Sequence, residues 1–171
     1  GVTTAISAGE IHLPGRPTDP AGVKAMAILA AKSYANFRPG GIKVEGGAVI
    51  LENGLVEDDF KEMAREGVRL VGEIGLGSAK TVEEAGPMVR WAKANGMTVM
   101  MHTGGTSMPG SSSVTARMVM DMDPDIASHV NGGTTSISID EIKKLVEDTS
   151  YILEIVHCGN PLAAVETMKL A

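Results

Sequence analysis

The chain has 171 residues, a formal net charge of −6 and 43% hydrophobic residues, which is the composition of one ordinary globular domain. The negative charge and the lack of any Lys/Arg run argue against a nucleic-acid-binding surface, and no apolar stretch is long enough to cross a bilayer. The single cysteine, Cys158, allows no internal disulfide, which favours a cytoplasmic location. These properties are typical of a cytoplasmic enzyme.

Strand and helix patterns alternate along the chain, as in a parallel sheet with helical crossovers. Short β-branched runs predict strands at residues 2–7, 42–51, 68–75, 97–101, 126–130 and 151–156. The helices that follow them are expected to begin near residues 21, 57, 81, 114, 138 and 161. Asp19 before Pro20, and the capping boxes that begin at Thr81 and Ser138, mark three of these helix starts.

Six βα units of this kind predict an α/β fold, a TIM-type (β/α)8 barrel that is present here as an incomplete barrel over residues 1–171. A complete barrel has eight units and about 250 residues. An open doubly wound sheet is the structural alternative, because it would be complete at this length and periodicity does not distinguish the two folds.

Polar residues stand at the predicted carboxyl ends of the strands, where either fold places its active site. Glu73 ends the third strand, His102 the fourth and His129 the fifth. One carboxylate and two imidazoles from successive strands match a hydrolytic metal site with an open position, and they suit zinc or iron. The alternative is structural: Glu73 pairs with a Lys or Arg, and the histidines bind loop carbonyls.

Further candidates follow the same strand ends. The predicted substrate contacts are His12, Thr103, Gly104, Asn131 and His157. The two histidines follow the first and sixth predicted strands, and the other three residues stand in loops whose glycines would let a ligand approach the backbone closely. Ordinary loop polarity is the alternative for His12 and His157.

Several runs of the sequence resemble the enamidase family of the amidohydrolase superfamily. The most specific are Gly72–Gly77, which reads Gly-Glu-Ile-Gly-Leu-Gly, and His102–Thr106, which reads His-Thr-Gly-Gly-Thr. Other matching runs lie at residues 1–4, 14–17, 109–112, 129–133 and 154–160. The similarity covers essentially the whole chain in order.

This resemblance implies a metal-dependent cyclic amidase with zinc and/or iron, binuclear in the complete family. Glu73 would be the bridging ligand, and His102 and His129 would be ligands from the next two strands. The implied reaction is hydrolysis of the cyclic amide C–N bond of 1,4,5,6-tetrahydro-6-oxonicotinate, by a metal-activated water, to 2-formylglutarate and ammonia in nicotinate degradation.

The resemblance also implies parts of the family pattern that have no counterpart in these 171 residues. They are the His-x-His pair of the first barrel strand, the proton-shuttle aspartate of the last strand and a β-sandwich. The catalytic proton shuttle is therefore unknown, and the chain alone is expected to be inactive. Open strand edges of such a partial barrel would favour a homo-oligomer.

Two other functions remain open. One is a different cyclic amidase, dihydroorotase-like or hydantoinase-like, which a substrate panel would distinguish. The other belongs to another class, a non-catalytic α/β domain that binds a small anion and no transition metal.

Overall fold

The computed structural model describes residues 1–7, 14–36, 39–106, 109–133, 135–148, 151–155 and 160–171. The strands are β1 (Thr4–Ile6), β2 (Lys43–Glu45), β3 (Leu70–Ile74), β4 (Thr98–Met101), β5 (Ile126–Ala127) and β6 (Ile152–Leu153). The helices are α1 (Pro20–Ala35), the short 3-10 helix η1 (Pro39–Gly41), α2 (Glu57–Arg65), α3 (Val82–Ala94), α4 (Ala116–Met122), α5 (Ile139–Asp148) and α6 (Pro161–Leu170). The predicted alternation of strands and helices is confirmed.

The strand order distinguishes the two predicted folds. All pairs are parallel, in the orders β1-β2 and β3-β4-β5-β6. Val49, which follows β2 in the chain, pairs in parallel with β3: its N–H donates to Leu70 O (2.9 Å), and its carbonyl accepts from Gly72 N–H (3.0 Å). This pairing places the segment after β2 next to β3. Strands that neighbour one another in chain order form a barrel wall, whereas a doubly wound sheet reverses its order. The fold is therefore part of a TIM-type barrel, and the doubly wound alternative is wrong.

The second predicted strand, residues 42–51, is not continuous. Only Lys43–Glu45 pair with β1, and the chain then turns at Gly47 before Val49 meets β3. Gly47 has φ +87°, and a Cβ there would lie 2.5 Å from Ala31 N in α1. The strand breaks because the turn passes directly against that helix. The fifth and sixth strands are also shorter than predicted, at two residues each.

The predicted helix starts are confirmed by their capping bonds. The Asp19 side chain accepts from Gly22 N–H (2.9 Å), and the Thr81 hydroxyl accepts from Glu84 N–H (3.3 Å). The Glu84 carboxylate accepts in turn from Lys80 N–H (2.7 Å). The first two bonds satisfy backbone donors that an α-helix leaves free at its first turn, and the third holds the residue before the N-cap of α3.

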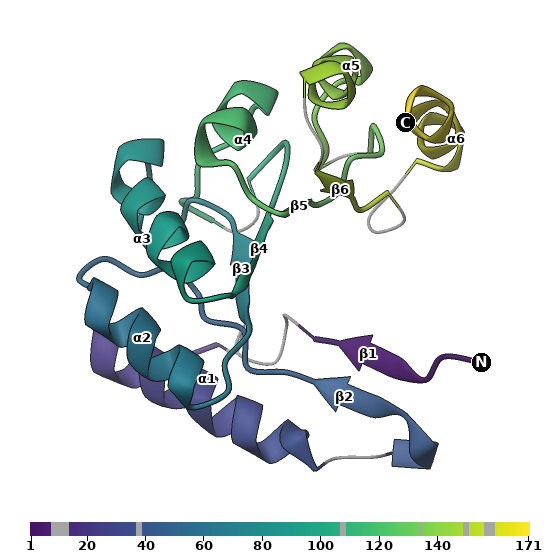
Figure 1. Cartoon of the computed structure of the whole chain (residues 1–171). Helices are drawn as coiled ribbons and strands as arrows, with labels where there is room; N and C mark the ends of the chain where they lie inside the picture. The colour runs from purple at the N-terminus through teal and green to yellow at the C-terminus, as the bar shows by residue number, and fades with distance from the viewer. Residues whose placement is uncertain (8–13, 37–38, 107–108, 134, 149–150, 156–159) are drawn as a thin grey trace.

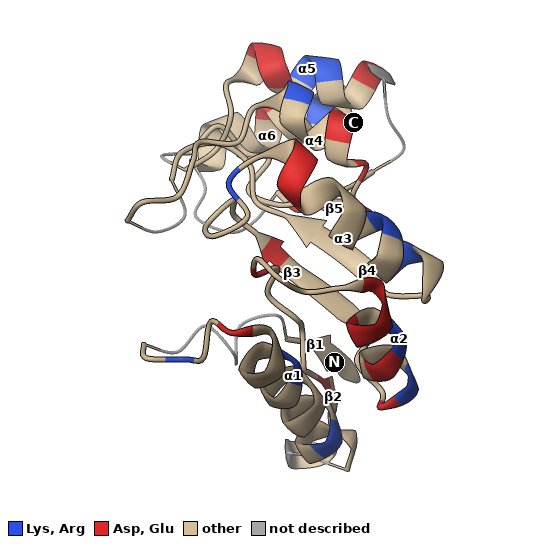
Figure 2. Cartoon of the chain, turned by 90° about the vertical axis from the view of Figure 1, so that its left-hand side faces the viewer, with Lys and Arg blue, Asp and Glu red and all other residues tan. Residues whose placement is uncertain are grey.

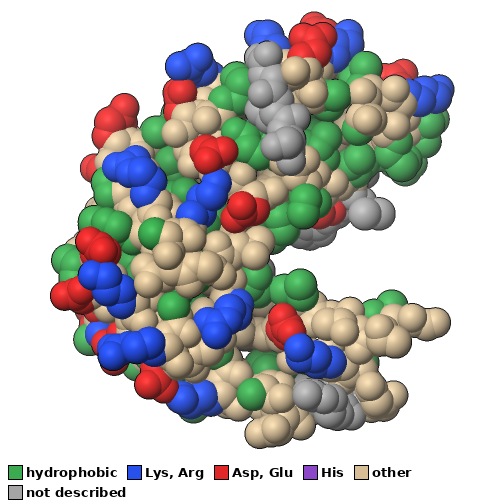
Figure 3. Space-filling model, viewed as in Figure 1, with side chains coloured by type: hydrophobic (Ala, Val, Ile, Leu, Met, Phe, Trp, Pro, Cys, Tyr) green, Lys and Arg blue, Asp and Glu red, His purple; other side chains and the backbone are tan. Residues whose placement is uncertain are grey.

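The helices lie around the outside of a curved wall of strands, and the wall is open on one side (Figure 1). Large apolar side chains fill the space between strands and helices, among them Phe60, Met63, Val71, Val99 and Leu145, which are fully buried. Charged side chains lie mainly on the outer helices, as α2 and α5 show in Figure 2. The space-filling view is hollowed on the open side (Figure 3).

Among the described helices, none is both long and apolar enough to span a membrane.

Candidate metal centre

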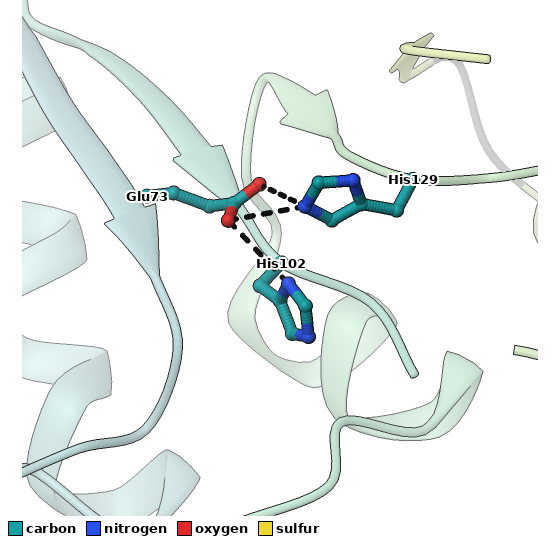
Figure 4. A group of neighbouring side chains, drawn as sticks. All are labelled: Glu73, His102 and His129. Carbon is teal, nitrogen blue, oxygen red and sulfur yellow. Dashed lines mark hydrogen bonds and ion pairs between the residues drawn. The ribbon is translucent and has the colours of Figure 1, made fainter. Parts of the chain in front are cut away.

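Three successive strands bring Glu73, His102 and His129 together at their carboxyl ends (Figure 4). One candidate ligand atom from each residue lies within 4.8 Å of the other two. The imidazole rings of His102 and His129 meet edge to face, with centroids 4.9 Å apart. The structure thus gathers the three residues that the sequence predicts for a metal site.

A β-bulge in β3 directs Glu73 toward the histidines. Val71 pairs with Val99 and Ile74 pairs with Met101. Two residues of β3 between these pairs therefore lie opposite one residue of β4. Bulges of this kind bend a strand and re-aim its side chains, and they are common beside active sites. Gly72 permits the local close approach, because a Cβ there would lie 3.1 Å from Met100 Cβ.

The orientation of His102 is set by a backbone carbonyl. Its Nε2 lies 2.6 Å from Gly105 O, which can only accept, so Nε2 carries a proton and donates. In the neutral ring, Nδ1 then holds a lone pair, and it lies 3.4 Å from Glu73 Oε2. Two acceptors therefore face each other at a buried position, which is unfavourable unless a proton or a metal cation lies between them.

His129 completes the group from the other side of the carboxylate. Its Nε2 lies 3.0 Å from Glu73 Oε1 and 3.2 Å from Oε2. The residue is only 4% exposed, and its backbone N–H donates to Glu154 Oε2 (3.0 Å). His129 is thus held at its backbone by Glu154 and at its imidazole ring by Glu73.

The carboxyl group of Glu73 is ionised in this environment. Burial raises the pKa of Glu73, but the hydrogen bonds and charges of His102 and His129 outweigh burial and hold the pKa well below its usual range. An anionic oxygen and two imidazole nitrogens are ligands that zinc and iron accept. The donor set therefore fits a divalent cation.

A cavity of about 920 Å³ adjoins Glu73, a volume in the range of small-molecule binding sites. Arg16 and Glu52 form part of its wall and are joined by an ion pair, with Arg16 Nη2 2.5 Å from Glu52 Oε1. Asn53 and Ser78 also line it, and Asn53 Nδ2 donates to Ser78 O (2.9 Å). Sequence analysis missed these residues because they lie in loops that carry no strand or metal-ligand pattern.

Two of the predicted substrate contacts have partners within the protein. The Thr103 hydroxyl is buried and donates to Ser128 O (2.7 Å). Gly104 pairs with Val114 through two backbone hydrogen bonds of 2.8 and 2.7 Å. Neither residue is among those that line the cavity. Their contact with substrate stays a prediction, and the described bonds show that both residues shape the loop after His102.

The other predicted substrate contacts are Asn131, His12 and His157. Asn131 is buried, and its side-chain oxygen accepts from Gly133 N–H (2.9 Å), which closes the turn after His129. His12 and His157 lie outside the described residues. The contact of Glu154 with His129 was not predicted, because Glu154 lies inside the sixth predicted strand, residues 151–156, and its neighbours depend on strand register.

The structure is a partial TIM-type barrel that places one carboxylate and two imidazoles at the ends of three neighbouring strands, and these side chains could hold a metal ion. No family model matches the chain. The enamidase of Eubacterium barkeri is 59% identical over 164 residues, which is 96% of this chain and 42% of that protein. A crystal structure of enamidase, described as a new member of the amidohydrolase superfamily, matches with a TM-score of 0.90 and 58% identity, over 98% of this chain and 43% of that one.

The chain is therefore similar in sequence and fold to enamidase, a member of the amidohydrolase superfamily, and it spans about two fifths of the length of that relative. The resemblance predicted from the sequence motifs is confirmed, and so is the barrel fold.

Proposed function

We propose that Glu73, His102 and His129 hold a divalent metal ion, zinc and/or iron, and that this centre serves the hydrolysis of a cyclic amide C–N bond. The geometry at His102 supports the proposal most directly. Because Nε2 donates to Gly105 O, Nδ1 is the ring nitrogen that faces the Glu73 carboxylate, at 3.4 Å, and in the neutral ring it offers a lone pair to a metal ion. Among the described residues, the ion pairs of Glu73 are with histidines and include no Lys or Arg. When both imidazoles are neutral, a metal ion would supply the positive charge that balances Glu73.

A bound divalent ion would polarise an amide carbonyl and lower the pKa of a water molecule. The residues of the chain have their own parts in this arrangement. Glu73 supplies the negative charge, and its low pKa keeps it ionised at neutral pH. Gly105 O fixes which nitrogen of His102 points inward. The adjoining cavity is large enough to hold a six-membered ring beside Glu73.

Homology to enamidase supports a cyclic amide as the substrate class. We propose 1,4,5,6-tetrahydro-6-oxonicotinate as the substrate, with 2-formylglutarate and ammonia as products. Dihydroorotate and hydantoin have rings of similar size, so a dihydroorotase-like or hydantoinase-like activity is the second candidate. The cytoplasmic location, the role in nicotinate degradation and the homo-oligomeric state stay predictions from the sequence.

The activity is tested in a chimaera in which this chain replaces the matching stretch of the Eubacterium barkeri enamidase. We expect the zinc- or iron-loaded chimaera to open the ring of 1,4,5,6-tetrahydro-6-oxonicotinate faster than it opens dihydroorotate or hydantoin. Glu73→Gln should abolish turnover, whereas Glu84→Gln, which alters only the start of α3, should not. A folded, metal-loaded chimaera that prefers dihydroorotate or hydantoin, or that hydrolyses none of the three, would contradict the proposal.

A further inference from the structure

His129 has an unusual backbone for a residue of the candidate metal centre. Its φ is +60°, in the left-handed region that side chains other than glycine rarely adopt. A non-glycine residue in this region costs free energy and persists only where its surroundings hold it there. Because the residue is also 4% exposed, neighbouring groups inside the protein must provide that constraint.

Glu154, which directly follows β6, supplies the constraint through its main chain and its side chain. Its N–H donates to Ala127 O (2.9 Å), and its carbonyl accepts from Val130 N–H (2.9 Å). Its carboxylate Oε2 accepts from the backbone N–H of His129 (3.0 Å). One residue thus binds the chain two residues before His129, at His129 itself and one residue after it.

The same carboxylate oxygen lies on the Nδ1 side of the His129 ring. Glu154 Oε2 is 3.9 Å from His129 Nδ1, which is beyond hydrogen-bond length but within range of electrostatic attraction. The opposite nitrogen, Nε2, faces Glu73. A neutral imidazole that offers Nε2 to a metal carries its proton on Nδ1, and a carboxylate on that side favours this tautomer.

We propose that Glu154 is a positioning residue for the metal centre. Its carboxylate holds His129 in the left-handed conformation and stabilises the imidazole with the proton on Nδ1, so that Nε2 is directed at Glu73. This inference rests on the proposed metal-binding function, and it assigns a role to a residue that is not among those lining the cavity.

Two variants separate the two parts of this role. Glu154→Gln keeps an oxygen that can accept from His129 N–H but removes the negative charge. Glu154→Leu has a similar size and removes both the acceptor and the charge. A matched control is Glu84→Gln, because the Glu84 carboxylate also accepts a backbone N–H, from Lys80, without contacting the metal centre.

The measurement is cobalt(II) titration of the metal-free 171-residue chain, followed by the visible d–d absorption, together with the thermal midpoint of each metal-free variant. Substitution of a residue that orients a metal ligand typically weakens metal binding by about 10–100-fold. We expect Glu154→Gln to weaken cobalt binding about 10-fold with little change in midpoint. Glu154→Leu should weaken binding further, change the spectrum and lower the midpoint. Glu84→Gln should leave cobalt affinity unchanged.

Unchanged cobalt affinity and spectrum in both Glu154 variants would overturn the role and would leave Glu154 as a residue that only ends β6. Failure of the unaltered chain to bind cobalt would be a different result: it would reject the metal centre itself, and the role of Glu154 with it.

Discussion

Two carboxylates on the wall of one cavity have opposite surroundings. Glu52 is 4% exposed and is bound to Arg16, with 2.5 Å between Nη2 and Oε1. Glu73 faces the imidazoles of His102 and His129 instead. A guanidinium is always charged, so the chain itself balances the charge of Glu52. An imidazole has no fixed charge, so the chain does not provide Glu73 with a permanent counterion from these neighbours.

The difference distinguishes a structural polar pair from a site suited to bind a cation. Burying an unbalanced charge is unfavourable, and proteins retain such a group where a ligand or a metal balances it. Arg16–Glu52 should therefore matter for folding and little for metal binding. The Glu73 centre should matter more for metal binding than for folding.

The largest expected effect is on stability, from Arg16→Met. This variant leaves Glu52 buried without its partner, and breaking a buried pair in this way costs about 3–5 kcal/mol. Urea unfolding of the metal-free chain measures the loss. The double variant Arg16→Met/Glu52→Met should recover most of it, because no buried charge remains. A loss below about 1 kcal/mol in the single variant would show that the pair is not structurally important.

The next effect is on metal affinity, from Glu73→Gln. Replacing the only anionic member of the candidate ligand set should weaken zinc binding by at least about 100-fold, which corresponds to about 2.7 kcal/mol. Competition with a chromophoric chelator measures the affinity. Glu52→Gln is the matched control on the same cavity wall and should change zinc affinity by less than about 3-fold. Equal effects of the two variants would remove the contrast between the sites.

A smaller effect is expected on the pH dependence of stability without metal. The folded-state pKa of Glu73 lies below that of an unfolded glutamate, about 4.3. Its ionised form therefore stabilises the fold above about pH 4.3, and this contribution is lost as pH falls through the folded-state pKa. Unfolding curves of the unaltered chain and of Glu73→Gln should converge on acidification. Parallel pH profiles would contradict the lowered pKa.

The smallest effect is expected at a half-buried charge cluster at the surface between α1 and α2. Lys24 Nζ lies 2.8 Å from both Asp59 Oδ1 and Glu62 Oε2. Burial raises the pKa of Asp59, but the hydrogen bond from Lys24 and further bonds and charge lower it below its usual range. Because such surface pairs contribute about 0–1 kcal/mol and are screened by salt, Lys24→Met should cost less than about 1 kcal/mol. Thermal melts at low and high salt measure this, and a salt-independent loss would indicate a packing role for Lys24 instead.

Much of the fold could be predicted from the sequence because local signals specify it. Helix starts at Asp19 and Thr81 follow from capping chemistry within a few residues. Strand lengths could not be predicted, because they depend on contacts with distant segments. The break at Gly47, for example, is caused by the approach of α1.

The candidate site was predictable to the extent that it follows strand ends. Glu73, His102 and His129 each stand at such an end, and parallel strands bring their ends together. The ion pair of Arg16 and Glu52 joins residues 36 positions apart in the chain, so no local pattern signals it. The bond from His129 to Glu154 depends on the parallel register of β5 and β6, which the sequence does not specify.

Zinc titration of the chelator-treated 171-residue chain by calorimetry tests the central claim most directly. We expect one ion to bind at the Glu73 centre, and about 2.7 kcal/mol of added stability when free zinc is 100 times the dissociation constant. Glu73→Gln and His129→Asn should each remove most of this binding. A chain that binds no zinc, or that binds it equally well with both substitutions, would contradict the account.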